Sequence, residues 1–283
     1  MAIILEALKC TCVSMTERPT PKPKQGIQSI EIGARLLRAL TLKGHALMLK
    51  DLARESGMPA AKAHRYLVSF IRAGLVDQDP YTGRYDLGSF ALELGLSSLA
   101  RLDPVRLADP FLDQLCEDIQ ETAALAVWGT HGATIVRLVE PRTPITITLR
   151  PGAVLPLLNS ATGLAFAAFG DTPAIRKALD VDLRAQAAQR NLALADIRAE
   201  VEPLLSEIRS HGLARASGSL TPGINGFSGP IRDYSGSMIA AITTLGSVGH
   251  FDDAWASPLA QAIRDVSRRL SKRLGFDDAD EPA

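Results

Sequence analysis

The side chains with the clearest potential for chemistry lie along one face of a short helix predicted to begin at Pro59 and to be stopped by Gly74. Lys62 and Arg65 are long hydrogen-bond donors that can reach guanine edges or phosphates, and small alanines can lie against a thymine methyl group. His64 can contact a phosphate or a base. The residues expected to face DNA are Pro59, Ala60, Ala61, Lys62, His64, Arg65 and Ser69. The alternative for each is a solvated surface position.

Two short helices joined by a tight turn are needed to present that face. The first is predicted over residues 49–56 and ends at Gly57, and the second buries Ala63 and Leu67 before it ends at Gly74. A short hairpin follows, and Arg84 on its returning strand can reach backbone phosphates. This pattern predicts a winged helix-turn-helix whose second helix enters a major groove. A small helical packing unit without a ligand is the alternative.

A second candidate site begins another predicted helix, at Asn159-Ser160-Ala161-Thr162-Gly163. Free amides and the helix dipole at this position favour an anion such as a carboxylate, and the hydroxyls of Ser160 and Thr162 can add donors. Ordinary capping and close packing of small side chains is the alternative. Apolar walls for the body of such a ligand would come from Ile145, Ile147, Ile224 and Phe227.

A hydrolase of esters or lactones with Ser160 as nucleophile is the alternative activity. His131 or His211 with an aspartate could complete a triad, but the chain lacks a Gly-x-Ser-x-Gly elbow, a Walker loop and a His/Glu metal motif. His131 also falls in a predicted hairpin turn, which is a poor place to hold a base. We therefore expect no catalytic residues and no enzyme activity.

Composition indicates a globular chain with an asymmetric charge distribution. No apolar run in the 283 residues is long enough to span a bilayer, so we expect a cytoplasmic protein without a membrane partner. Residues 1–102 hold 14 basic and 9 acidic residues, whereas residues 103–283 hold 17 and 22. A basic front half suits a DNA-binding module, and its small excess of charge predicts that two copies bind together.

Cysteine and histidine give no sign of a metal site or a cofactor. Cys10, Cys12 and Cys116 are too few for a disulfide framework, and the first two lack the spacing of a structural zinc site. We predict neither a metal nor a cofactor.

The linker between the two halves is predicted to be a helix that is apolar on more than one side. Its large apolar residues are Phe90, Leu92, Leu94, Leu96 and Leu99. Because they cover so wide an arc, we expect this helix to pair two copies of the chain. Burial against its own domains is the alternative.

The second half is predicted to mix strands and helices. Helices at the ends and middle of one antiparallel sheet give an α+β fold. Strands are expected over 122–128, 133–139, 145–150, 213–218, 225–232 and 236–245, and helices over 105–120, 160–169, 172–189, 195–211 and 255–274.

Five segments are predicted along the chain: a disordered Pro- and Lys-rich arm (1–25), the winged helix-turn-helix (26–88), the linker helix (89–102), the second domain (103–275) and an acidic tail (276–283). The first helix is expected from Ser29 to Leu42, with Ser29 as its N-cap. Met15 is an alternative start of the chain to Met1.

Several motifs together resemble the IclR family of bacterial transcriptional regulators, in the family's order and from about Gly26 to Leu274. They are Gly26–Glu31, Met58–Leu67, Asp79–Gly88, Arg150–Leu157 with Ser160–Gly163, and Pro222–Gly236.

The resemblance implies a winged helix-turn-helix, a linker helix and a GAF-like domain that binds a small effector. It also implies homodimers or tetramers on double-stranded operator DNA, usually controlling a catabolic operon. Family members hold the effector, here expected to be a small organic acid, in a cup on the sheet. By position the cup corresponds to Ile145, Ile147, Ala161, Thr162, Ile224, Gly226, Thr243 and Leu245.

Three departures from the family bear on the expected effector. Many members carry Cys at the position of Gly226, some an acidic residue near Ala216, and some Ser at the position of Leu245. The cup is therefore expected to be roomier at Gly226 and more apolar at Leu245. Both changes favour an aromatic or larger acid over a small polar keto acid.

Overall fold

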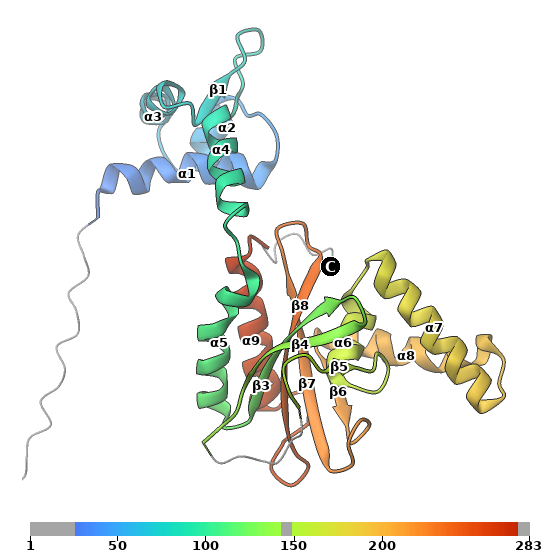
Figure 1. Ribbon diagram of the computed structural model, residues 1–283. Coiled ribbons are helices and arrows are strands. Elements are labelled where there is room, and N and C mark those ends of the chain that lie inside the picture. The colour runs from blue at the N-terminus through green and yellow to red at the C-terminus, as the bar shows by residue number, and fades with distance from the viewer. Residues whose placement is uncertain (1–25, 143–148, 277–283) are drawn as a thin grey trace, which may run out of the picture. The chain divides into compact units, whose positions relative to one another are not determined.

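A computed structural model describes residues 26–142 and 149–276 (Figure 1). The chain divides into two compact units, with the boundary between Ala100 and Arg101. The predicted arm, Ile145 and Ile147 with most of their predicted strand, and the tail beyond Phe276 lie outside the described residues.

The first unit has the elements predicted for a winged helix-turn-helix. Its buried residues, among them Leu36, Leu52 and Leu67, form one core. β1 and β2 pair antiparallel, and Leu47 bridges Tyr85 beside them. The elements are α1 (Gln28–Lys43), α2 (Leu49–Glu55), α3 (Ala60–Arg72), β1 (Val76–Gln78), β2 (Tyr85–Leu87) and α4 (Ser89–Leu99).

One detail of the predicted first helix is wrong. Ile27 holds the N-cap position of α1, and no side chain caps that end, so Ser29 lies inside the helix. The two turn glycines were predicted correctly, because Gly57 and Gly74 have φ values of 65° and 72°. This left-handed region is the one that glycine adopts without strain.

The second unit is built on an antiparallel sheet, whose strands within the described residues follow the order β5-β4-β3-β8-β7-β6. The short strand β5 was not predicted. The strands are β3 (Thr122–Gly129), β4 (Gly132–Val139), β5 (Val154–Leu155), β6 (Ala214–Ser217), β7 (Ile224–Arg232) and β8 (Met238–Ser247).

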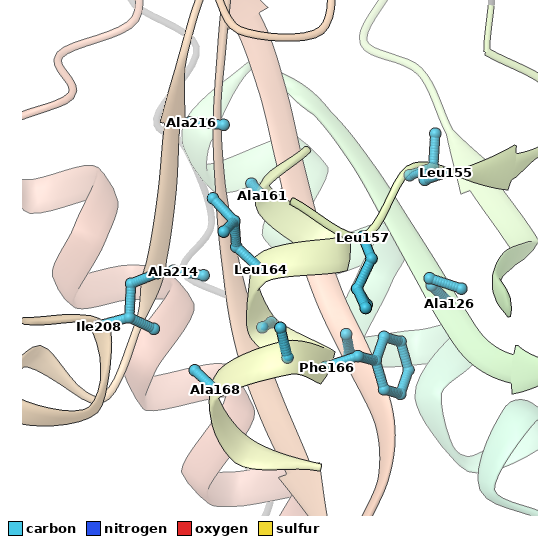
Figure 2. Close-up of a cluster of buried hydrophobic side chains, with 14 of the residues drawn as sticks. Ala126, Leu155, Leu157, Ala161, Leu164, Phe166, Ala168, Ile208, Ala214 and Ala216 are labelled. Atoms are coloured by element: carbon cyan, nitrogen blue, oxygen red, sulfur yellow. The ribbon is translucent and has the colours of Figure 1, made fainter. Parts of the chain in front are cut away.

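Different helices cover the two faces of this sheet (Figure 1). On the α5/α9 face, α5 (Pro104–Ile119) and α9 (Pro258–Arg273) enclose a cluster that contains Leu125 and Ile242. On the α6 face, α6 (Ala161–Phe169) lies against the sheet. Figure 2 shows the cluster on that face, where small residues such as Ala126 and Ala214 let α6 approach closely. Successive residues of β3 therefore belong to opposite clusters, with Ala124 and Ala126 on the α6 face and Leu125 on the α5/α9 face.

Two further helices, α7 (Pro173–Arg190) and α8 (Leu194–His211), follow α6, and α8 packs against it. The predicted α+β architecture is confirmed. Within residues 26–142 and 149–276, no helix is long and apolar enough to cross a membrane.

Candidate DNA interface and effector site

The residues predicted to read DNA lie on the exposed side of α3. Ala63 and Leu67 are completely buried on its other side, so the amphipathic pattern holds α3 against the core of the first unit. Pro59 occupies the N-cap position, directly before the first helical residue. The exposed predicted residues are Pro59, Ala60, Ala61, Lys62, His64, Arg65 and Ser69.

The long side chains on this surface are available to a ligand. The side chains of Lys62, His64 and Arg65 make no hydrogen bond or ion pair with any residue that the structure describes. Ser69 Oγ donates to the Arg65 carbonyl at 3.2 Å, and Arg84 Nη1 donates to the Ala46 carbonyl at 3.1 Å. Arg84 thus ties the returning strand of the wing to the loop before α2 and keeps its charge at the surface.

The tip of the wing is held by one carboxylate. Asp79 Oδ1 accepts hydrogen bonds from the amides of Tyr81 at 2.7 Å and Thr82 at 3.2 Å. These bonds favour the ionised form and lower the pKa of Asp79 below its ordinary value. The wing is therefore an ordered hairpin beside the exposed helix.

The start of α6 combines a cap with free amides. Ser160 Oγ accepts from the amide of Gly163 at 2.9 Å and donates to the carbonyl of Pro156 at 2.8 Å, so Ser160 is the cap of α6. The amides of Ala161 and Thr162 have no acceptor within the helix and are the groups that an anion would meet.

This arrangement does not support Ser160 as a nucleophile. Its hydroxyl is buried and bonded to the backbone on both sides. His211, one of the two candidate bases, instead stacks on Trp255 with ring centroids 4.3 Å apart.

A chain of hydroxyl groups joins α6 to the sheet. Thr162 Oγ1 and Thr243 Oγ1 are 2.8 Å apart, and Ser228 Oγ and Thr243 Oγ1 are 2.9 Å apart. All three residues are buried. Ser228 was missed by sequence reasoning, although strand alternation from Gly226 places it on the same face.

Most of the predicted cup residues that the structure describes lie on the α6 face. Strand register places Gly226 opposite Leu245 and Ser228 opposite Thr243. Gly163 is required for close packing, since a Cβ there would lie 2.1 Å from the Pro156 carbonyl oxygen. Ile224 and Leu245 are partly exposed, whereas the others are buried. The residues of this group are Ser160, Ala161, Thr162, Gly163, Ile224, Gly226, Thr243 and Leu245.

Two predictions about the cup are wrong. Phe227 is completely buried in the cluster of the α5/α9 face, because it follows Gly226 in the strand and points to the other side of the sheet. The space beside Gly226 is not open either, since a Cβ there would lie 2.8 Å from Leu245 Cδ2. The side chain that lies against Gly226 is the apolar one of Leu245.

A groove of about 380 Å³ lies between α7 and α8, away from the predicted cup residues. Leu179, Leu183 and Val201 contribute to its lining. Asp180 at its edge pairs with both Arg184 and Arg198 at 2.6 Å, which lowers its pKa. The groove is therefore a second place where a small molecule could be accommodated.

Comparisons with known proteins identify the family. Residues 29–80 match the model described as IclR helix-turn-helix domain, and residues 96–272 match the model described as Bacterial transcriptional regulator IclR C-terminal.

The chain belongs to the IclR family of bacterial transcriptional regulators.

Similar proteins agree with this assignment over nearly the whole chain. The glycerol operon regulatory protein of Streptomyces griseus is 32% identical over 253 residues, which is 89% of this chain and 98% of that protein. The crystal structure of HmgR from Pseudomonas aeruginosa is 35% identical, with a TM-score of 0.79, and covers 89% of this chain and 100% of that chain. The repressor BlcR of Agobacterium tumefaciens, at 23% identity and a TM-score of 0.71, shows the same fold.

The protein is therefore an IclR-type DNA-binding transcriptional regulator, and its relatives are regulators rather than enzymes. The exposed face of α3 and the wing are the parts of the described chain that suit contact with operator DNA. Within the described residues, no group of three or more His, Cys, Asp and Glu side chains is placed to hold a metal ion.

Proposed function

We propose that this IclR-family regulator binds a small organic acid between the start of α6 and the α6 face of β7 and β8. The acid would change how a dimer or tetramer holds its operator, and so control a catabolic operon. Control of an operon is supported by relatives named glycerol operon regulatory protein and acetate operon repressor, the latter from Salmonella typhimurium and 31% identical over 150 residues.

Binding of an acid is supported by the capped start of α6, which lies next to an apolar part of the sheet. The amides of Ala161 and Thr162 are donors without an intrahelical acceptor, and the helix dipole adds partial positive charge. Ile224 and Leu245 are the partly exposed apolar residues nearby on β7 and β8. A carboxylate at the amides and an apolar or aromatic body on these side chains is the pose that this chemistry favours.

Coupling to DNA requires that the acid bind the DNA-competent and incompetent forms with different affinity. We propose α4 as the element that pairs two copies, because none of its residues is buried and Leu92, Leu94 and Leu96 are 64%, 50% and 56% exposed. Pairing would bury these leucines and bring two weakly basic DNA-binding units onto one operator.

Calorimetric titration of the full chain tests the acid, using aromatic and short-chain acids beside their neutral amides. Acids should bind at least about tenfold more tightly than the matched amides, since the charge-assisted hydrogen bonds need the carboxylate. Equal affinity for the acids and their amides would contradict an anion site at the start of α6.

A pair of variants distinguishes acid binding in the cup from acid binding in the groove between α7 and α8. Ile224→Trp fills the cup and should abolish acid binding, whereas Leu179→Trp fills the groove and should leave it unchanged. The reverse result would show that the effector binds in the groove between α7 and α8. Each acid that binds is then added to an operator-binding titration followed by fluorescence anisotropy, where a change in affinity is expected.

A further inference from the structure

Three buried oxygen atoms on the α5/α9 face have no hydrogen-bond partner in the described part of the chain. They are Glu121 Oε2, Asn225 Oδ1 and Thr244 Oγ1. Their residues are only 7%, 5% and 0% exposed. Such atoms are rare in folded proteins, because a buried polar group without a partner loses its hydrogen bonds to water and gains none within the protein.

The sheet brings Glu121 and Asn225 together at Gly246, and it places Thr244 two residues along on the same face. Asn225 of β7 lies directly opposite Gly246 of β8, and a Cβ at Gly246 would lie 2.4 Å from Glu121 Oε2. The Glu121 carboxylate therefore occupies the space of the missing side chain at Gly246, beside Asn225. Thr244 points to the same face of β8, since it is two residues from Gly246.

Among residues 26–142 and 149–276, the Glu121 carboxyl forms no ion pair. Burial raises the pKa of this carboxyl, and His250, which is exposed, opposes that shift to a smaller extent. The ring of Phe251 also lies at Gly246, with Cδ2 2.7 Å from the same added Cβ. Arg215, on the neighbouring strand β6, donates to the Asp253 carbonyl and lies over the ring of Trp255.

We propose that Glu121, Asn225 and Thr244 bind a small hard cation, of the class of Na⁺ or Ca²⁺, between β3, β7 and β8. A carboxylate, an amide oxygen and a hydroxyl are the hard oxygen ligands that such cations prefer over the nitrogen and sulfur ligands of zinc. The cation neutralises Glu121 and gives each of the three orphaned oxygens a partner. This site lies on the opposite face of the sheet from the proposed effector cup and does not depend on it.

Thermal unfolding of the full chain tests the site without any operator or effector. The wild-type protein is treated with a chelator and held in choline chloride, and CaCl₂ or NaCl then replaces choline at constant ionic strength. At about ten times its Kd, either cation should raise Tm by about 3–6 °C, because it binds only the folded state. With a single carboxylate in the site, the Kd for Ca²⁺ should be about 10⁻³ M.

Three variants make the result specific. Glu121→Gln keeps the shape but removes the charge, and should abolish the response to cations. Glu140→Gln, at an exposed position in the same unit, should retain the response. Asn225→Asp adds a second carboxylate and should tighten Ca²⁺ binding at least about tenfold by calorimetry.

An unchanged Tm of the wild-type protein in both cations would overturn the proposal, and so would a cation response that persists in Glu121→Gln. If Glu121→Gln does not fold, the calorimetric comparison of Asn225→Asp with the wild-type protein decides, since equal Ca²⁺ affinity excludes a site at residue 225.

Discussion

A Cβ added at Gly33 of α1 would lie 2.8 Å from Cζ of Phe70 on α3 and 3.2 Å from Cδ1 of Tyr66. The backbone of α1 therefore rests directly on the inner face of α3. Any side chain at residue 33 would force the rings of Phe70 and Tyr66 to move. The exposed face of α3 depends on this contact, because α3 is held in place from behind by α1.

Gly33→Ala should destabilise the first unit by about 0.5–2 kcal/mol, because the cost of forcing an extra methyl group into a packed core exceeds the helix-propensity gain of about 0.5–1 kcal/mol. Urea denaturation of the full chain measures the change. Gly95→Ala is the matched control, since nothing lies within 4 Å of a Cβ at that position of α4. The control should stabilise its helix by about 0.5–1 kcal/mol. Equal stability of the Gly33 variant and the wild-type protein would contradict close packing of α1 on α3.

Arg65→Ala should weaken operator binding by about 1–3 kcal/mol if the guanidinium contacts a base, and should leave the urea midpoint unchanged. The side chain is exposed and has no partner among residues 26–142 and 149–276, so its loss should affect operator binding and not the stability of the fold. Anisotropy titration of an operator fragment measures the affinity. Arg106→Ala, an exposed arginine of the second unit, should bind as the wild type does. Unchanged binding by the Arg65 variant would remove this residue from the interface.

Thr243→Val should destabilise the second unit by about 1–3 kcal/mol, because it leaves buried hydroxyls of Thr162 and Ser228 unpaired. Thr162→Val leaves Thr243 with its bond to Ser228 and should therefore have a smaller effect. Denaturant unfolding of the two variants gives the comparison. An equal loss in both would mean that Thr243 does not link the other two hydroxyls.

Ser160→Ala should cost about 1 kcal/mol of stability, because it removes the cap of α6. Ser257→Ala is a matched control, since Ser257 caps α9 in the same way through the amide of Ala260. Both variants should show similar losses in denaturant unfolding, but only the Ser160 variant should weaken binding of the acid. Loss of acid binding in both would indicate a general effect of stability on the cup.

The order of the wing should depend on the ionisation of Asp79. Hydrogen bonds from the amides of Tyr81 and Thr82 lower its pKa, so their contribution is fully present above the ordinary value of 3.8 and is lost as pH falls through the lowered pKa. The amide resonances of Tyr81 and Thr82 should titrate in NMR spectra with a midpoint below 3.8. In Asp79→Ala this titration should vanish, and a midpoint at or above 3.8 in the wild-type protein would contradict the hydrogen bonds.

Features set by neighbouring residues were predictable from the sequence. The spacing of Ala63 and Leu67 identified the buried side of α3, and Gly57 and Gly74 marked the ends of the two short helices. Capping at the start of α6 was among the readings of its sequence, because a hydroxyl at this position bonds to an amide of the first turn, as Ser160 does. Such interactions span only a few residues, so their pattern can be read directly along the chain.

Features set by pairs of strands were decided only by the tertiary structure. β7 is buried on both faces, since helices cover both sides of the sheet, and its sequence therefore lacks the alternation of polar and apolar residues that reveals a face. Phe227 was placed in the cup for this reason, although a shift of one residue along a strand reverses the face. The contact of Gly226 with Leu245 and the approach of Glu121 to Gly246 depend on strand register, which brings together residues that lie far apart in the sequence.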